Sequence, residues 1–556
     1  MTVEEIKRDS DYLRGTLVSE LAEKSAAFAE DSTQILKFHG VYQQDDRDRR
    51  RGADRDYVMM VRASIPGGVL SAEQYLVADE LSDWVGDGTL RITSRQGLQW
   101  HQVRKGSLRP MIWTLNQSLV TTFGACGDVV RNVVACPGPS TAGLDLSGWA
   151  GRLADRFRPR TNAYYEVWID GARTVSAEAT GDAGTAEPIY GSGYLPRKFK
   201  VGIAASGDNC VDVYTHDVGL IAVAESDGSL VGFTVLVGGG QGRSHNQPET
   251  YSRLADPLTT VPPADVLDVV ETVVTIVRDH GDRTDRKQAR LKYLIDRWGP
   301  DRFRTEVEKR LGWSLPEAER VEKMSVRDHF GWHRSDDSWW LGVHVENGRI
   351  SDAADKRLRT ALLAIADRFR PEFRFTPQQN VLLSGFADRD REPVDRILAD
   401  HGIVPANRLA AVVRDSMACV ALPTCALALT DAERALPEVA RSIAEVLSDI
   451  GLDEEEIGLR MTGCPNGCAR PYSTEIGLVG HRRGRYDIHL GGARDGTRLN
   501  DLFLESVPTG SVAEALRPLL AAFASGREQG ETFGDFVHRH GLDWFKAASV
   551  AGKTSS

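Results

Sequence analysis

The feature of this sequence that most constrains its fold is an internal duplication. Residues 90–103 (LRITSRQGLQWHQV) resemble residues 373–386 (FRFTPQQNVLLSGF), which lie 283 positions later. The matched positions are Arg91, Thr93 and Gln96 with Arg374, Thr376 and Gln379; Val129-Val130-Arg131 with Val412-Val413-Arg414; Cys136 with Cys419; and DVGLIAVAE from Asp217 with EIGLVGHRR from Glu475. Repeated matches in one order indicate two copies of a single folding unit.

Strand and helix signals alternate irregularly along both copies. Apolar runs such as YVMMVRASI, LIAVAE and FTVLVGG predict strands. Helical spacing of apolar residues predicts helices over 264–281, 286–299, 355–369, 439–451 and 511–523. Because no regular βαβ alternation is present, the predicted class is α+β. Glycine pairs after strands, as at Gly491-Gly492, lack a Walker or GxGxxG pattern, so a nucleotide-binding loop is not indicated.

Charge and composition exclude several classes of function. The formal net charge is −11 over 556 residues, which argues against generic nucleic-acid binding. The charge run over 45–51 (DDRDRRR) predicts a solvated loop of self-paired charges. No apolar run is long enough for a membrane span, and residues 1–20 lack the apolar core of a secretory signal. We therefore expect a cytoplasmic protein without nucleic-acid or membrane partners.

Four of the seven cysteines are concentrated within 50 residues, as Cys419-x5-Cys425 and Cys464-x3-Cys468. An odd number of cysteines in a long chain argues against a disulfide framework. Thiolates from two short loops can hold a cubane iron–sulfur cluster, and the Pro, Gly and Asn residues nearby favour tight turns that direct N–H groups toward sulfur. Zinc and buried free thiols are the alternatives, although the x5 spacing fits zinc poorly.

The sequence around these cysteines resembles that of sulfite and nitrite reductases. The resemblance is carried by ACVALPTC, TGCPNGCARPY, KFHGVYQQDDRD, GACGDVVRNV, EPIYGSGYLPRKFK, RLKYLIDRWG and GETFGDF, which together span residues 37 to about 545. It implies duplicated halves about a pseudo-twofold axis, with sirohaem between them. It also implies that Cys419, Cys425, Cys464 and Cys468 ligate a [4Fe–4S] cluster and that Cys468 is the axial ligand shared with the sirohaem iron.

The same resemblance implies three domains around the sirohaem. The expected division is an N-terminal wrapping segment at 1–56, a discontinuous first domain of two ferredoxin-like half-domains at 57–125 and 335–405, a substrate and sirohaem domain at 126–334, and a cluster domain at 406–556.

A site that reduces a small oxyanion needs fixed cations opposite the negatively charged cluster. By the resemblance, the substrate-binding cations are Arg62, Arg131, Lys198 and Lys200. In an extended strand Lys198 and Lys200 would point to one side. The carboxylates of sirohaem also need polar contacts, for which the candidates are Arg91, Thr93, Arg95, Gln99, His101, Arg197, Lys292 and Asn466. For His101, a role as a packed core histidine is the competing interpretation.

The resemblance implies six-electron reduction of sulfite to sulfide. The sequences GACGD, PIYGSGYLPRKFK and CARPY resemble the ferredoxin-dependent enzymes more closely, so reduced ferredoxin is the expected electron donor. The alternatives are the haemoprotein subunit of an NADPH-dependent sulfite reductase, a ferredoxin–nitrite reductase, and an iron–sulfur electron carrier or redox sensor. Lysine at both positions of RKFK favours sulfite, because sulfite carries more negative charge than nitrite.

Two residues of the resembling motifs have no ligand role in this interpretation. Tyr42 lies in FHGVYQQ and Cys126 in GACGD. In some ferredoxin-type bacterial members a tyrosine and a cysteine in these motifs are joined by a thioether bond beside the sirohaem. A packed tyrosine and a small buried thiol are the alternative interpretation here.

Overall fold

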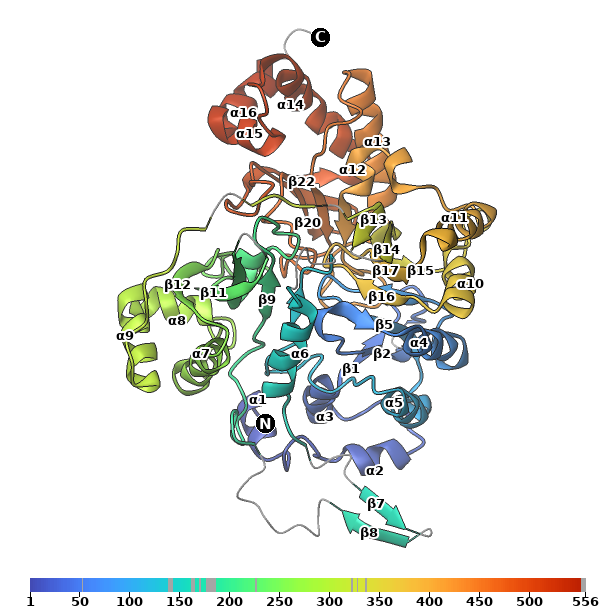
Figure 1. Ribbon diagram of the computed structural model, residues 1–556, viewed down its shortest axis with the longest axis vertical. Helices are drawn as coiled ribbons and strands as arrows, with labels where there is room; N and C mark the ends of the chain where they lie inside the picture. Colours follow the sequence, from blue (N-terminus) through green and yellow to red (C-terminus); the bar gives the residue numbers. More distant parts are fainter. Residues whose placement is uncertain are drawn as a thin grey trace.

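The computed structural model describes residues 1–52, 54–138, 144–161, 166–169, 172–176, 187–225, 228–321, 324–327, 329–335 and 338–551. The N-terminus lies in the lower part of the molecule, and the helices toward the C-terminus (red) lie at its upper end (Figure 1). Helices and sheets are mixed throughout, which confirms the α+β prediction. Among the described residues, no helix combines the length and apolar character needed to cross a bilayer.

Two five-stranded sheets form the centre of the molecule and are built from equivalent strands of the two copies. Their orders are β1-β2-β5-β4-β15 and β13-β14-β17-β16-β3. The strands are β1 (Val41–Asp45), β2 (Tyr57–Arg62), β3 (Val69–Leu70), β4 (Leu90–Ile92), β5 (Leu98–Val103), β13 (Gly331–Ser335), β14 (Ser338–Val343), β15 (Arg349–Ile350), β16 (Glu372–Phe375) and β17 (Val381–Phe386). Each copy gives one edge strand to the other sheet, since β15 pairs with β4 and β3 pairs with β16.

The other two large sheets repeat one another strand for strand, in the orders β12-β11-β10-β9-β6 and β22-β21-β20-β19-β18. The strands are β6 (Val134–Ala135), β9 (Val201–Ala204), β10 (Val218–Ala224), β11 (Leu230–Val237), β12 (Asp256–Val261), β18 (Ser416–Ala418), β19 (Leu459–Thr462), β20 (Ile476–Arg482), β21 (Arg485–Leu490) and β22 (Asp501–Pro508). Register is conserved as well: β9 pairs in parallel with β10, and β19 with β20, at positions 258 residues apart. A separate hairpin comprises β7 (Glu166–Ile169) and β8 (Ala172–Ser176).

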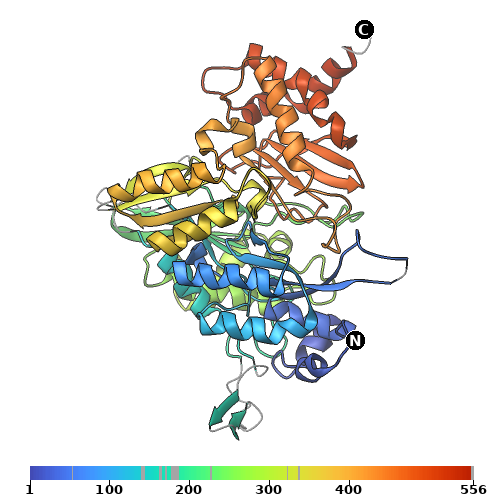
Figure 2. The same ribbon diagram turned by 90° about the vertical axis from the view of Figure 1, so that its right-hand side faces the viewer.

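Helices cover the outer faces of these sheets (Figures 1 and 2). They are α1 (Val3–Arg8), α2 (Leu17–Ala22), α3 (Glu30–Leu36), α4 (Ala72–Val85), α5 (Leu108–Gln117), α6 (Leu146–Arg156), α7 (Val266–His280), α8 (Leu291–Trp298), α9 (Pro300–Leu311), α10 (Leu358–Phe369), α11 (Arg391–Asp400), α12 (Ala411–Arg414), α13 (Leu436–Asp449), α14 (Val512–Gly526), α15 (Phe533–His540) and α16 (Leu542–Ala551). All five predicted helices form, because each buries one apolar stripe, as α7 does with Val270, Val273 and Val277.

Reciprocal contacts join the two copies at the centre. Gln96 Nε2 donates to the Phe375 carbonyl at 2.8 Å, and its equivalent Gln379 donates to the Ile92 carbonyl at 3.4 Å. Phe375 and Ile92 are themselves equivalent, and both glutamines have left-handed φ, 59° and 69°. Each copy thus makes the same hydrogen bond to the other copy, and such reciprocal contacts are characteristic of twofold symmetry. This confirms the duplication and the pseudo-twofold packing.

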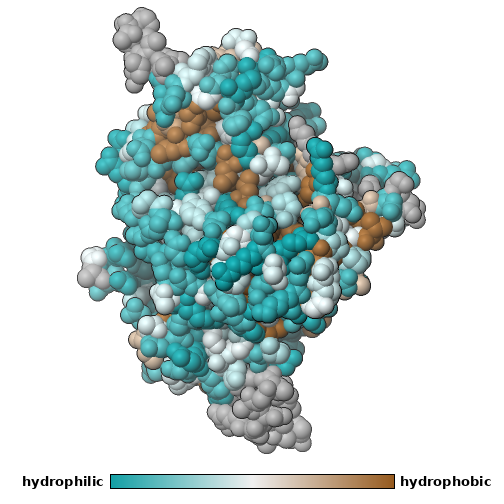
Figure 3. All heavy atoms as spheres, turned by 90° about the vertical axis from the view of Figure 1, so that its left-hand side faces the viewer, coloured by the Kyte–Doolittle hydropathy of each residue, from teal (hydrophilic) through white to brown (hydrophobic). Residues whose placement is uncertain are grey.

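One face of the molecule is shown in Figure 3. Hydrophilic side chains predominate on it, and the most extended apolar patch lies toward its upper end. The charge run at 45–51 behaves in part as predicted, since Arg50 pairs with Asp45 and Arg49 Nε lies 3.6 Å from Asp46. Arg47 departs from the prediction, because its guanidinium turns inward to backbone carbonyls of a distant loop.

Candidate functional site

The four clustered cysteines lie at one edge of the β18–β22 sheet. β18 and β19 are parallel neighbours, so Cys419 and Cys464, which follow them, emerge side by side. Cys425 and Cys468 follow in tight loops that contain left-handed residues, Ala421 at φ 55° and Gly467 at φ 64°. Parallel pairing therefore brings together two loops that lie far apart along the chain.

The surroundings of these thiols suit a cluster of positive ions. Burial and then the charge of Cys468 raise the pKa of the Cys419 and Cys425 thiols, and they raise the pKa of Cys464 to about 12. Backbone N–H groups oppose this effect, including that of Gly463, which donates to Cys419 Sγ at 3.4 Å. Ionised thiolates this close together repel one another, and iron ions placed between them would remove that repulsion. The N–H donors to sulfur also favour the ionised form.

Three of the predicted substrate cations lie near Cys468. Arg62 ends β2, and its charge is favoured by Cys126, Tyr42 and Cys468. Burial and then the charge of Arg197 lower the pKa of Lys198 to about 7, whereas Cys468 raises it. Burial and then Lys198 hold the pKa of Lys200 well below its usual value, again opposed by Cys468. The exposed Cys468 thus faces a concentration of positive charge.

Lys198 and Lys200 flank Phe199, which forms an isolated bridge with Val130 and belongs to no longer strand. The segment still brings both lysines together with Arg131, because the Arg131 N–H donates to the Phe199 carbonyl at 2.8 Å. Neither lysine ammonium has a carboxylate partner among the residues that the structure describes. Cations that are half-buried and unpaired are costly, so their retention points to a bound anion.

Three further predicted arginines surround this group. Arg131 Nε donates to the Gly127 carbonyl at 2.6 Å. Arg95 donates to the Val201 carbonyl at 3.1 Å and contacts His216 Nδ1 at 3.1 Å; burial and then Arg131 lower its pKa to about 9. Burial also lowers the pKa of Arg197, which Asp128 opposes. The result is a strongly positive interior with few counter-charges.

The other predicted contacts already have protein partners. Arg91 Nε binds Glu433 at 2.9 Å, and His101 Nδ1 contacts Arg349 at 3.2 Å. Lys292 Nζ donates to the carbonyls of Gly240, Gly242 and Tyr251. The Thr93 hydroxyl accepts a hydrogen bond from the Gly97 N–H. The Gln99 amide, oriented with its oxygen toward Arg62, accepts from that guanidinium at 2.6 Å. The N–H groups of Asn466 favour the thiolate form of Cys464.

Sequence reasoning missed several residues that support the site. Arg47 donates to the Pro423, Cys425 and Ala428 carbonyls and so holds the loop that carries Cys425. The sequence carries no signal for Arg47, because it lies in a run of charged residues and its carbonyl acceptors are far away along the chain. Ser94 holds the Cys468 carbonyl at 2.9 Å.

A buried ion pair supports the lysine segment. Arg290 and Asp217 pair at 2.6 Å, and Asp217 also accepts the Lys200 N–H at 2.9 Å. The signal in the sequence was the motif RLKYLIDRWG, of which Arg290 is the first residue.

Tyr42 and Cys126 are brought together beside the cations. Arg62 Nη1 donates to Cys126 Sγ at 3.0 Å, and the Arg62 guanidinium carbon lies 5.8 Å from the centre of the Tyr42 ring. Burial and then the neighbouring Cys126 raise the pKa of Tyr42 to about 12, and the two side chains share a hydrogen bond. The geometry satisfies the proximity that a thioether bond requires; the bond itself stays a prediction.

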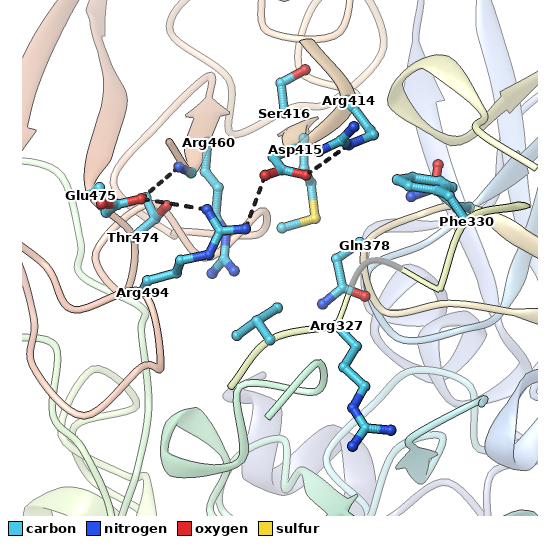
Figure 4. A pocket seen from close by; sticks show the side chains of 14 residues that line it. Arg327, Phe330, Gln378, Arg414, Asp415, Ser416, Arg460, Thr474, Glu475 and Arg494 are labelled. Carbon is cyan, nitrogen blue, oxygen red and sulfur yellow. Dashed lines mark hydrogen bonds and ion pairs between the residues drawn. The ribbon is translucent and has the colours of Figure 1, made fainter. Parts of the chain in front are cut away.

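A second charged pocket lies in the equivalent place in the other copy (Figure 4). Its Gln378, Arg414 and Asp415 correspond to Arg95, Arg131 and Asn132 at the offset of 283. Here the charges neutralise each other: the Arg494 guanidinium lies 3.1 Å from Asp415 and 2.6 Å from Glu456. Within the described part of the chain, this duplicated site therefore offers no comparable set of unpaired cations for an anion.

Family models match most of the chain. "Nitrite and sulphite reductase 4Fe-4S domain" matches residues 148–315 and 410–552, and "Nitrite/Sulfite reductase ferredoxin-like half domain" matches residues 50–117 and 333–401.

Individual relatives match almost the full length. The chain is 46% identical over 549 residues to the sulfite reductase (NADPH) hemoprotein beta-component of Acidithiobacillus ferrooxidans, covering 97% of this chain and 96% of the relative. It is 42% identical over 558 residues to the sulfite reductase (ferredoxin) of Synechococcus elongatus, covering 97% and 89%. The solved structure of the Mycobacterium tuberculosis NirA protein has the same fold, with a TM-score of 0.77, 24% identity, and coverage of 97% and 96%.

Proposed function

The chain belongs to the nitrite and sulphite reductase family, and from that premise we propose that it reduces sulfite to sulfide at a sirohaem coupled to a [4Fe–4S] cluster. The observation that carries the proposal is the pair of lysines without carboxylate partners in the described chain, Lys198 and Lys200, whose charges are both favoured by Cys468. An electron carrier without substrate chemistry would have no use for these half-buried, unpaired cations.

The residues present fit both cofactors. Cys419, Cys425, Cys464 and Cys468 would hold the cluster, with Cys468 also facing the sirohaem iron. Arg95 and Arg197 would supply positive charge for the sirohaem carboxylates, and Arg91, Thr93, Gln99, His101, Lys292 and Asn466 would complete or support its surroundings. When bound, the two cofactors supply the electrons and the iron on which the S–O bonds are broken.

The protein's own groups bind the substrate and move protons. Arg62, Arg131, Lys198 and Lys200 would surround sulfite, with the arginines gripping its oxygens and the lysines acting as compact charges. A lysine whose pKa lies near 7 can donate a proton at neutral pH and be recharged from water. Each S–O cleavage consumes protons, so such a donor belongs beside the substrate.

The identity of the donor is part of the proposal. We assign reduced ferredoxin, on the basis of the GACGD, PIYGSGYLPRKFK and CARPY motifs. Relatives named for NADPH and for ferredoxin both match over nearly the whole chain, so a flavoprotein partner is the alternative. Anaerobic sulfide formation should occur with reduced ferredoxin and not with NADPH plus a flavoprotein reductase subunit. Nitrite offered in place of sulfite should be the poorer substrate; a preference for nitrite would identify a nitrite reductase.

Two structural proposals accompany this function. The first is the division into segments 1–56, 57–125 with 335–405, 126–334 and 406–556. The second is a Tyr42–Cys126 thioether. Peptide mapping tests the thioether: a linked peptide pair that is lighter by two hydrogens supports it, and complete alkylation of Cys126 in separate peptides contradicts it.

A further inference from the structure

A second group of metal-binding side chains lies outside the site described above. It comprises Cys136, Asp208, Cys210 and His329, all buried, and their donor atoms lie within 4.8 Å of one another. Cys136 Sγ lies 3.3 Å from Asp208 Oδ2 and 3.8 Å from His329 Nε2, and these last two atoms lie 3.0 Å apart. We propose that these four residues bind one zinc ion.

The donor–donor distances are close to those around a single tetrahedral ion: 3.3 Å and 3.8 Å from Cys136 Sγ fall within the expected range, and 3.0 Å between Asp208 and His329 is slightly shorter. Zinc bonds of about 2.3 Å to sulfur and about 2.0 Å to nitrogen or oxygen place neighbouring donors roughly 3.3–3.8 Å apart. Two thiolates, one imidazole and one carboxylate are all preferred zinc ligands, and they fill its four positions. Because no position is left for water, the ion would be structural rather than catalytic.

The internal duplication strengthens the assignment. Cys136 follows β6 as Cys419 follows β18, and each donates its N–H to an equivalent carbonyl, that of Ile203 at 3.0 Å or of Met461 at 3.2 Å. Cys210 lies 258 residues before Cys468, the spacing that relates β9 to β19 and β10 to β20. Two of the four residues therefore occupy the positions of two proposed cluster ligands in the other copy.

The other two ligand positions differ between the copies. Cys464 corresponds to Ser206, so this copy lacks that thiol, and Cys425 corresponds to Ala142, which lies outside the described residues and carries no thiol either. Asp208 and His329 supply the remaining donors instead. A set of two sulfurs, one nitrogen and one oxygen within 4.8 Å is too compact for a four-iron cluster, and it suits one ion.

The surrounding structure fixes the ligands. Asp208 Oδ1 accepts the N–H groups of Cys210 at 3.0 Å and Arg327 at 3.2 Å, which turns Oδ2 toward the other three donors. His329 has a left-handed φ of 56°, a conformation that a histidine keeps only where its surroundings hold it. Hydrogen bonds that orient the residues binding an ion, like those to Asp208, are typical of metal sites.

The ion would connect three separate segments. Cys136 follows β6, Asp208 and Cys210 follow β9, and His329 precedes β13. The group adjoins the pocket in Figure 4, since Gln378 donates to the Cys210 carbonyl and the Arg327 N–H that binds Asp208 belongs to a residue lining that pocket. A zinc ion here would fix the three segments beside the pocket that is equivalent to the proposed active site. This inference does not depend on the proposed sulfite reduction.

The test is elemental analysis and Zn K-edge X-ray absorption on the cofactor-loaded protein, purified without chelators. About one zinc per chain is expected, with two sulfur neighbours at about 2.3 Å and two lighter ones at about 2.0 Å. The variants Cys210→Ser and His329→Gln should lose the zinc and keep their iron, whereas His344→Gln, a control that follows β14, should keep both.

Absence of zinc from wild-type protein that holds its full iron and sirohaem would overturn the proposal. Zinc with no sulfur neighbours would overturn it as well, and so would a Cys136–Cys210 disulfide found by mass spectrometry in protein purified under reducing conditions. Because the wild-type spectrum decides the matter, a variant that fails to fold leaves the proposal testable.

Discussion

Asp212 and Arg470 form an ion pair of 2.5 Å between Asp212 Oδ2 and Arg470 Nε, and the two residues hold the same position in the two copies, 258 residues apart. Their φ angles are 53° and 54°. Equivalent residues can touch only where a twofold axis passes between them. Two identical charged residues at this position would repel each other. The attraction between Asp212 and Arg470 exists because the two copies carry different residues at the axis.

This asymmetry extends to the two sites on either side. The site that contains Cys468 keeps lysines that have no carboxylate partner in the described chain, whereas the site beside Cys210 pairs Arg494 with Asp415 and Glu456. One site can therefore bind an anion and the other is neutralised from within.

Cys468 should affect both cofactors. Changing Cys419, Cys425 or Cys464 to Ser should abolish the EPR signal of the reduced cluster. Cys468→Ser should in addition shift the sirohaem absorption bands, because this thiolate would be shared. If Cys468→Ser leaves the sirohaem spectrum and its magnetic coupling to the cluster unchanged, the bridging assignment is wrong.

Lys200→Asn should discriminate between substrates. Removal of one cation costs a dianion about twice as much as a monoanion, so kcat/KM for sulfite should fall on the order of 10- to 100-fold and that for nitrite by less. Steady-state assays with both anions measure this, with the exposed Lys309→Asn as the control. An equal loss for both substrates would assign Lys200 a structural or shared role.

The pH dependence of turnover should reflect Lys198. Burial lowers its pKa to about 7, so the free enzyme loses this cation as pH rises through that value, and anion binding should weaken above it. Sulfite itself titrates near neutrality; nitrite stays an anion over about pH 6 to 9 and isolates the contribution of the enzyme.

The diagnostic variant is Lys198→Arg, which stays charged in this range. It should retain kcat/KM for nitrite above neutrality, where the wild type declines. A wild-type profile for nitrite that is flat, or a decline that Lys198→Arg does not alter, would exclude Lys198 as the titrating group.

Arg47→Ala should weaken the cluster. The guanidinium donates to three carbonyls of the loop around Cys425, and charge-assisted hydrogen bonds contribute about 1.5–3 kcal/mol each. The variant should lose iron several-fold faster in air, followed by the fall in cluster absorbance. Arg49→Ala, which removes a side chain that is 63% exposed, is the control. Equal decay rates for the two variants would mean that Arg47 does not stabilise the loop.

The sequence was sufficient for the duplication, the fold class and the five helices, because these depend on local apolar periodicity and on repeated motifs. It was also sufficient to select residues that the fold brings together, such as Arg62, Lys198 and Cys468. It could not reveal Arg47, whose partners lie some 380 residues away, or the exchange of β3 and β15 between sheets. Nor could it reveal the Cys136 group, since His329 approaches it only through tertiary packing.

We propose that the chain reduces sulfite completely at the site between Cys468 and the two lysines. The most direct measurement is the ratio of electrons consumed to sulfide released under anaerobic conditions, with a reduced viologen dye as the donor. We expect six electrons per sulfide, with no accumulated intermediate, and near-complete loss of sulfide formation when Lys198 and Lys200 are both changed to Asn. Consumption of the dye without sulfide, or full activity in the double variant, would contradict it.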